Sequence, residues 1–200
     1  MPNLSHRSDF VRRVFAIAIS VGFASAIAAS KWVEEHRLPK DSEWSPLLCL
    51  LAGLILMVGS WEGYHRHFSK TDEKITIFFT DVTLLFTYLL ILLLSPAPIL
   101  FLWLVAIVFA LYAAWDLQVL LYYREKDSWK RFLITVLWTL GFAFLTHFWH
   151  EKPGNPNWVA YSVGAAGIMF RVRALRTVPW TVCAIIITCG AYPILTTYGQ

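Results

Sequence analysis

Histidine and carboxylate side chains, which can bind metals or titrate, gather at two places in the chain. One group is Glu62, His65 and His67, and the other is His147, His150 and Glu151. In the second group the H-x-x-H spacing puts both imidazoles on one face of a helix. Two histidines and one carboxylate are an incomplete ligand set for zinc or iron, whereas histidine titrates near neutral pH. Either histidine pair is therefore a better candidate for sensing pH than for binding a metal.

Three carboxylates, Glu62, Asp81 and Asp116, interrupt otherwise apolar segments. An ionised side chain inside a membrane is costly, so each is a candidate functional residue. At about 1.5 Å per residue, all three fall within roughly 10 Å of the same end of the predicted bundle. A layer of carboxylates there could draw cations toward a pore or relay protons. The alternative is structural, with each carboxylate paired to a nearby base, for which the candidates are Arg12, Arg13, Arg66 and Arg171.

Seven apolar segments position these groups, each close to the roughly 20 residues that a membrane-spanning helix needs. They cover about residues 14–33, 46–64, 76–95, 99–123, 132–149, 155–170 and 179–198. Hydrophobic residues make up 58% of the chain and charged residues 15%, too apolar a composition for a soluble domain. The sequence predicts an all-α, polytopic integral membrane helical bundle that forms one transmembrane domain over residues 1–200. If the short, glycine-rich segment 155–170 is re-entrant, six spans remain.

Lys and Arg residues fall mainly in alternate gaps between these segments, and this asymmetry predicts the orientation. Positive residues mark the cytoplasmic side of a membrane protein. The N-terminus is therefore predicted to be cytoplasmic and, with seven spans, the C-terminus lies outside. The net charge of +4 comes from these loops, so we expect no nucleic-acid partner. The thirteen bases on the N-terminal side are Arg7, Arg12, Arg13, Arg66, Lys70, Lys74, Arg124, Lys126, Lys130, Arg131, Arg171, Arg173 and Arg176, and the other four are Lys31, Arg37, Lys40 and Lys152.

The same topology argues against metal chemistry and catalysis. It puts the two histidine groups on opposite sides of a hydrocarbon core about 30 Å thick, so they cannot share an ion. Cys49, Cys183 and Cys189 lie inside the apolar segments without C-x-x-C spacing, as expected of small packing residues. The sequence contains no Walker loop, G-x-S-x-G or H-E-x-x-H motif. We therefore expect no enzyme activity, no bound metal and no cofactor.

The first apolar segment differs from the others because small residues recur along it every four positions. Ala18, Gly22 and Ala26 form this pattern, and Ser30 continues it. Such spacing lets helix backbones approach closely in lipid, where packing drives helix association. The segment is therefore predicted to be a helix-packing element at the centre of the bundle or along a symmetry axis.

The first half of the chain carries motifs of a known family. Residues 10–20 read F-V-R-R-V-F-A-I-A-I-S, residues 61–68 read W-E-G-Y-H-R-H-F, and a leucine-rich segment ends at Ser95-Pro96. Over about residues 10–96 the chain resembles the bacterial and lysosomal potassium leak channels that lack a P-loop. Their first helix has the pattern R-x-x-x-F-S-D followed by G-V-F-A-I-A-I-T, and their second has W-x-x-H-H-x-x-F. Here Val11 and Arg12 replace the family's Ser and Asp.

The resemblance implies a homo-oligomer, a tetramer in that family, with a hydrophobic constriction on the first helix of each copy. It implies that the pore is lined by Ile17, Ser20, Val21 and Ala24. It also implies conduction of monovalent cations, potassium first among them, and a location in a bacterial inner membrane among membrane lipids. The family has six helices with both ends inside, whereas this chain is predicted to have seven.

A cation channel or leak pathway is therefore the function that we expect first. Two alternatives stay open. One is a small-solute transporter, although internal repeats that would support it are not evident. The other is a membrane-embedded effector or scaffold subunit, for example of a bacterial defence system, which would suit short loops and packed helices.

Overall fold

The computed structural model describes residues 6–68, 74–124, 128–151, 157–171 and 177–186. The helices are α1 (His6–Ala28), α2 (Lys31–Glu34), α3 (Asp41–Phe68), α4 (Ile75–Leu93), α5 (Pro98–Tyr123), α6 (Ser128–Glu151), α7 (Asn157–Arg171) and α8 (Val178–Ile185). No strand occurs in the described residues. The predicted all-α class is thus confirmed.

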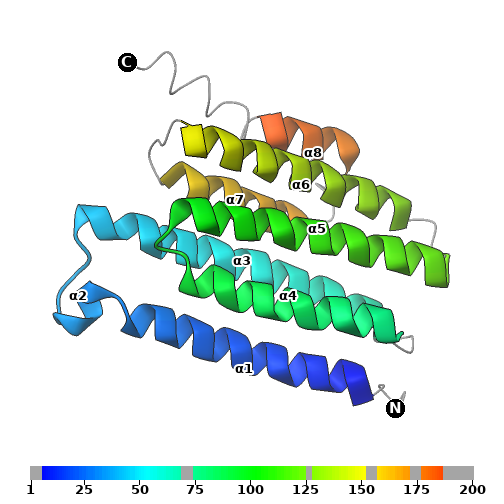
Figure 1. Cartoon of the computed structure of the whole chain (residues 1–200), viewed down its shortest axis with the longest axis horizontal. Coiled ribbons are helices and arrows are strands. Elements are labelled where there is room, and N and C mark those ends of the chain that lie inside the picture. Colours follow the sequence, from blue (N-terminus) through cyan, green and yellow to red (C-terminus); the bar gives the residue numbers. More distant parts are fainter. Residues whose placement is uncertain (1–5, 69–73, 125–127, 152–156, 172–176, 187–200) are drawn as a thin grey trace.

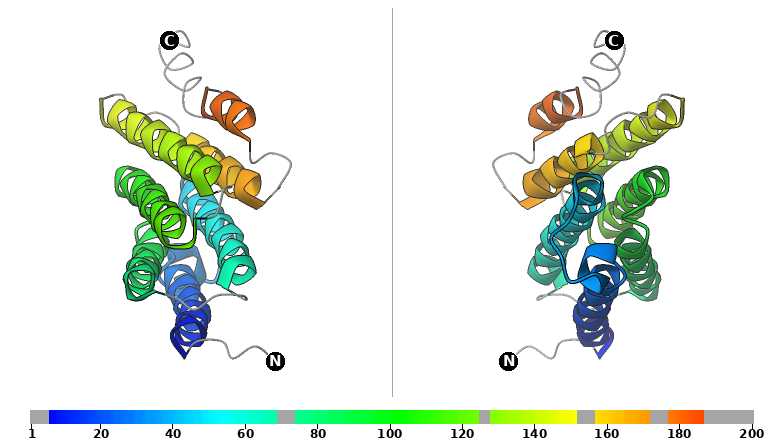
Figure 2. Two further views of the ribbon diagram at one scale, coloured as in Figure 1. Left: turned by 90° about the vertical axis from the view of Figure 1, so that its right-hand side faces the viewer. Right: turned by 90° about the vertical axis from the view of Figure 1, so that its left-hand side faces the viewer.

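The long helices lie side by side, and their direction alternates from one to the next along the chain (Figure 1). α5 packs along α6 and α3 packs along α7, and these two pairs make the most extensive contacts. α4 lies between α1 and α5, while α8 lies against α6. Seen end-on, α1 stands at one edge of the bundle and α8 at the opposite edge (Figure 2).

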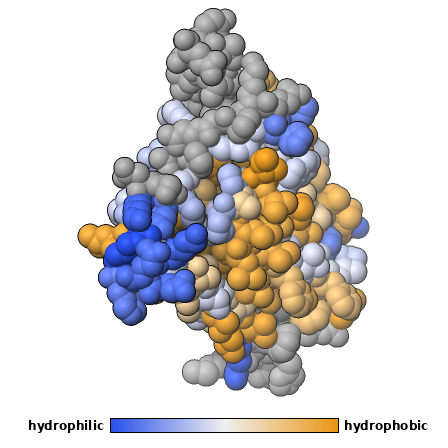
Figure 3. Space-filling model, turned by 60° about the vertical axis from the view of Figure 1, so that its left-hand side comes forward, coloured by the Kyte–Doolittle hydropathy of each residue, from blue (hydrophilic) through white to orange (hydrophobic). Residues whose placement is uncertain are grey.

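Three of the described helices are long and apolar enough to cross a membrane, namely Ile75–Leu93, Pro98–Tyr123 and Trp129–His150. Shorter apolar helical stretches cover Arg13–Ala28, Glu43–Gly59 and Trp158–Met169. Large apolar side chains cover much of the outer surface, and hydrophilic residues gather at one end of it (Figure 3). Such a surface, with apolar side chains that face outward as well as inward, fits a protein embedded in lipid. Residues 187–198 of the last predicted segment lie outside the described residues.

The helix boundaries differ from the predicted segments mainly at the first one. The predicted segment 14–33 is divided, because α1 ends at Ala28 and the extended backbone of Ser30 (φ −79°, ψ 128°) starts the short helix α2. α7 contains 15 residues, a length of about 22 Å. It is therefore a continuous helix that is shorter than the hydrocarbon core of a bilayer, about 30 Å thick.

A proline-rich turn, Ser95-Pro96-Ala97-Pro98, joins α4 and α5 in a hairpin. The N–H of Ala97 donates to the carbonyl of Leu94 at 2.9 Å, and Pro98 is the first residue of α5. Proline suits this position because its missing N–H would have no partner inside the helix. At the other end of α5, Arg124 has a left-handed backbone (φ 52°) that ends the helix.

Stacked aromatic rings hold α5 against α6 in the core. The ring of Phe109 on α5 lies 5.8 Å from that of Trp138 and 5.3 Å from that of Phe142, both on α6. All three side chains are fully buried. Such pairs add to the burial of apolar surface, which makes the α5–α6 contact rigid.

Glycine brings α7 unusually close to α3. A Cβ atom at Gly167 would lie 3.0 Å from the backbone nitrogen of Leu56 and 3.1 Å from its Cα. A Cβ atom at Gly164 would meet only the Cβ of Ala52, at an ordinary contact distance of 3.9 Å. The glycine content of segment 155–170 is therefore explained by backbone packing against α3.

Candidate functional site

One face of α1 is packed against α4 of the same chain. Phe15 is buried and its ring meets that of Tyr88 edge-on, with centroids 5.7 Å apart. Gly22 faces the C-terminal part of α4, where an added Cβ would lie 2.9 Å from Cδ1 of Leu92. Side chains from both helices line a small apolar hollow between them, namely Phe15, Ala18, Ile19, Leu85, Tyr88, Leu89 and Leu92.

The residues predicted to pack helices together lie on this side of α1. Gly22 is buried, and Ala18 and Ala26 are half-buried against the core. The small-residue stripe is thus in contact with neighbouring helices of the same protomer. Within the protomer, α1 lies at the edge of the bundle and not at its centre, which was one of the two predicted positions (Figure 2).

The four residues predicted to line a pore form the opposite face of α1. Ile17 is 64% exposed and Val21 is 58% exposed, and Ser20 and Ala24 are exposed beside them. The spacing of i, i+3, i+4 and i+7 puts them in one row along the helix. The hydroxyl of Ser20 donates to the carbonyl of Ala16 at 2.8 Å, so it remains bonded within its own helix.

Asp116 is held inside the bundle between α5 and α6. The Nε of Arg131 donates to its Oδ1 at 3.1 Å, and the hydroxyl of Thr135 lies 3.5 Å from its Oδ2. The Asp116 side chain is 7% exposed and that of Arg131 is 34% exposed. A carboxylate inside the bundle thus has a base beside it. That base is Arg131, which is none of the four candidates that the sequence suggested.

Asp81 lies on the neighbouring helix α4 and is buried. Thr80 beside it accepts a hydrogen bond from the side-chain amide of Gln118 on α5, at 2.9 Å. The Thr80–Gln118 contact joins α4 to α5, and the Asp116–Arg131 contact joins α5 to α6. Both lie in the half of the bundle that contains the start of α4 and the end of α5. The third predicted carboxylate, Glu62, belongs to α3, but its side chain lies outside the described residues.

The histidine groups are far apart along the chain and lie on different helices. His147 and His150 are exposed near the end of α6. His65 and His67 belong to the end of α3, and their side chains are outside the described part of the chain. In the part of the chain that the structure describes, no three His, Cys, Asp or Glu residues gather as metal ligands would.

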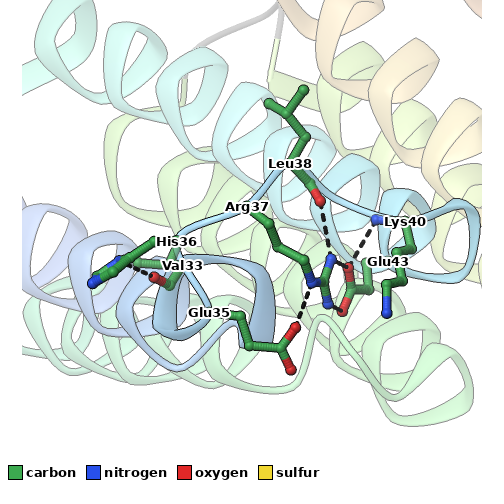
Figure 4. A network of polar contacts seen from close by, with 7 residues as sticks. All are labelled: Val33, Glu35, His36, Arg37, Leu38, Lys40 and Glu43. Carbon is green, nitrogen blue, oxygen red and sulfur yellow. Dashed lines mark hydrogen bonds and ion pairs between the residues drawn. The ribbon is translucent and has the colours of Figure 1, made fainter.

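Sequence reasoning missed a polar cluster between α2 and α3 (Figure 4). The guanidinium of Arg37 binds Glu43 through two nitrogens, each 2.7 Å from a carboxylate oxygen, and its Nε donates to Glu35. Arg37 also donates to the carbonyl of Leu38 at 2.9 Å. The backbone N–H of Lys40 donates to Glu43 at 2.8 Å, as in the capping box of a helix N-terminus.

These contacts shift the titration of both charged groups. The hydrogen bonds from Arg37 and from the backbone of Lys40 hold the pKa of Glu43 at about 2, below its ordinary value of 4.5. The contacts with Glu43, and then with Glu35, raise the pKa of Arg37. Both groups are therefore ionised over the whole physiological pH range. The available signal in the sequence was a basic residue, Arg37, six positions before an acidic one, Glu43, just ahead of the apolar segment predicted over residues 46–64.

A pair of tyrosines was also missed. The hydroxyl of Tyr88 on α4 bonds that of Tyr112 on α5, between the two helices of the α4–α5 hairpin. Since Tyr88 also contacts Phe15, it links α1 through α4 to α5.

Comparison of the chain with family models, with curated proteins and with solved structures finds no match.

Proposed function

We propose that the protein is an oligomeric membrane channel or leak pathway for monovalent cations, in which the exposed face of α1 lines the pathway. In this arrangement the chain crosses the membrane seven times with its N-terminus in the cytoplasm, in a bacterial inner membrane. Copies of the chain surround the pathway, and Ile17 and Val21 form its narrow apolar section. Potassium is the first ion to test.

The observation that carries this proposal is the composition of the exposed face of α1. Between residues 13 and 28 it consists of Arg13, Ala16, Ile17, Ser20, Val21, Ala24, Ser25 and Ala28. Most of these side chains are small or carry a hydroxyl, and only two are large and apolar. Small residues and hydroxyls favour contact with other helices or with a narrow pathway over contact with lipid chains.

The exposed faces of α4 and α5 provide the contrast. α4 exposes five large apolar residues, Ile75, Phe79, Phe86, Leu90 and Leu93, beside Thr76 and Thr83, and α5 exposes six, Leu100, Trp103, Ile107, Leu117, Leu121 and Tyr122, beside Ala110 and Ala114. Bulky apolar side chains of this kind suit lipid. α1 therefore differs from its neighbours on the one side where it has no partner in the protomer, which supports an oligomer with α1 facing inward.

The test is ion flux into liposomes that contain the purified protein, measured with potassium, sodium and proton gradients and compared with empty vesicles. Ile17→Trp and Val21→Trp are expected to reduce cation flux at least tenfold, because the larger side chain fills a narrow apolar pathway. Ile107→Trp is the matched control, because it enlarges an exposed isoleucine on α5. Its flux is expected to equal that of the wild type.

Equal flux in the Ile17 and Ile107 variants would contradict a pathway along α1. Absence of flux under every gradient would contradict the channel itself and would leave a transporter or a membrane-embedded effector or scaffold.

The predicted orientation of the chain in the membrane is tested separately. Cysteines at exposed positions Lys31 and Arg124 are expected to react with an impermeant maleimide from outside and inside the cell, respectively, in a background without the native cysteines.

A further inference from the structure

Three exposed bases lie at one end of the bundle, where three successive helices begin or end. Lys74 precedes the first residue of α4, Arg124 follows the last residue of α5, and Lys130 is in the first turn of α6. The start of α4 lies beside the end of α5, since Ile77 and Val119 form one buried apolar cluster. α6 begins at the same end, because it packs along α5 in the opposite direction (Figure 1). We call Lys74, Arg124 and Lys130 the basic edge.

Exposed aromatic side chains accompany these bases. Tyr122, two residues before Arg124, is 49% exposed, and Trp129, directly before Lys130, is 55% exposed. Tyr and Trp residues are enriched at the level where the hydrocarbon of a membrane meets its headgroups. Leu121, beside Tyr122, is 66% exposed, as suits a residue that contacts lipid chains. In a membrane, the basic edge therefore lies at the level of the lipid phosphate groups.

The acidic residues around the basic edge do not cancel its positive charge. Asp116, the buried carboxylate nearby, is bound by Arg131, which is not part of the basic edge. The stretches that contain the basic edge, residues 69–74 and 124–131, carry six bases and four acids in the sequence. An excess of positive charge therefore remains at this level. The four acids are Asp72, Glu73, Glu125 and Asp127, which lie outside the described residues.

The opposite end of the bundle has no such excess. Residues 30–43, which lead from α1 to α3, contain three bases and four acids. Arg37 is bound there by Glu43 and Glu35. Lys31 and Lys40 are exposed, like the residues of the basic edge, but they stand among these acids. These two lysines are therefore a matched control for the basic edge.

We propose that the basic edge binds the headgroup of an anionic phospholipid, of the phosphatidylglycerol type. The negative charge of its phosphate is not neutralised within the lipid, whereas the choline group neutralises it in phosphatidylcholine. Lys and Arg residues at the ends of membrane helices attract such a headgroup. Arg124 and Lys130 belong to two helices that pack together, so both can approach the same headgroup region. Lipid binding is measured without an ion gradient, so it is tested separately from the proposed pathway.

The test is native mass spectrometry of the full-length protein, released from detergent micelles after addition of lipid. Phosphatidylglycerol and phosphatidylcholine with identical acyl chains are compared through the lipid concentration at which half of the protein retains one lipid molecule. For the wild type, this concentration is expected to be at least fivefold lower for phosphatidylglycerol. Equal concentrations for the two lipids would overturn the proposal.

The double variant Arg124→Asn with Lys130→Gln removes two charges of the basic edge. Asn tolerates the left-handed backbone at position 124. This variant is expected to raise the concentration required for phosphatidylglycerol at least fivefold and to leave that for phosphatidylcholine unchanged. Arg124→Lys with Lys130→Arg keeps both charges and is expected to behave as the wild type.

Lys31→Gln with Lys40→Gln is the control, since it removes two exposed bases from the opposite end of the bundle. It is expected to retain phosphatidylglycerol as the wild type does. An equal loss of retention in the control and in the neutral variant of the basic edge would overturn the proposal. Unchanged retention in that neutral variant, or a loss in the variant that keeps both charges, would overturn it as well.

Discussion

The Nε of Arg131 lies 3.1 Å from Oδ1 of Asp116, joining the start of α6 to the last third of α5. The carboxylate is nearly buried, whereas the guanidinium is one-third exposed. A charge inside an apolar bundle is tolerated when an opposite charge and hydrogen bonds accompany it. The pair therefore favours a structural role for Asp116 over a role in conduction.

Replacement of Arg131 by Gln removes the positive charge beside a buried carboxylate. We expect the free energy of unfolding to fall by roughly 1–3 kcal/mol, less than for a fully buried pair because Arg131 is partly exposed. Thermal unfolding in detergent measures the change. The double variant with Asp116→Asn is expected to recover part of the loss, since no uncompensated charge remains. A conducting role for Asp116 would instead show as lower flux per channel at unchanged stability.

Gly167→Ala is expected to destabilise the contact between α7 and α3. The added methyl group would lie about 3 Å from backbone atoms of Leu56, which cannot rotate away. We expect a loss of roughly 1–3 kcal/mol, typical of an overpacked core. Gly164→Ala is the control in the same helix, because its methyl group would meet Ala52 at an ordinary 3.9 Å. Equal melting temperatures for the two variants would contradict this close approach.

Gly22→Leu is expected to destabilise the single protomer as well as any assembly. A Cβ at this position already meets Leu92 at 2.9 Å and Leu89 at 3.1 Å, so a longer side chain would push α1 away from α4. Ala24→Leu adds the same atoms on the exposed face and is expected to leave the melting temperature of the protomer unchanged. Unfolding followed under monomer-forming detergent conditions separates the two effects. A stable Gly22→Leu protomer would argue against the packing of α1 on α4.

The contact between Arg37 and Glu43 is expected to resist acid down to unusually low pH. The pKa of Glu43 in the folded protein is about 2, below its ordinary value of 4.5. A lowered pKa means that the stabilisation is complete above about pH 4.5 and is lost as the pH falls toward 2. The distance distribution between spin labels at Glu34 and Leu100, measured by pulsed electron paramagnetic resonance, is therefore expected to be the same at pH 7 and pH 5 and to widen near pH 2. Widening already at pH 5 would contradict the lowered pKa.

Local sequence pattern predicted much of the fold. Apolar runs of the right length predicted helices that match α4 and α5 to within two residues, and the sequence between them, Ser95-Pro96-Ala97-Pro98, is typical of a tight turn. These features depend on residues that are close together in the sequence, through their hydrophobicity and the fixed backbone angle of proline. The break after Ala28 was not predicted, because the small residues before and after it continue the same pattern.

The partners of the polar residues were decided by tertiary structure alone. The sequence indicated that Asp116 lies in an apolar helix and needs a base, but several bases were available. Packing of α6 along α5 put Arg131 beside it. In the same way, the four-residue spacing of Ala18, Gly22 and Ala26 predicted a close helix contact without naming the neighbour. The neighbour is α4, because the C-terminal part of α4 carries Leu89 and Leu92, whose side chains pack into the space that Gly22 leaves open. The sequence determines which side chains need an interaction partner, whereas only the tertiary packing decides which of the available groups lies close enough to be that partner.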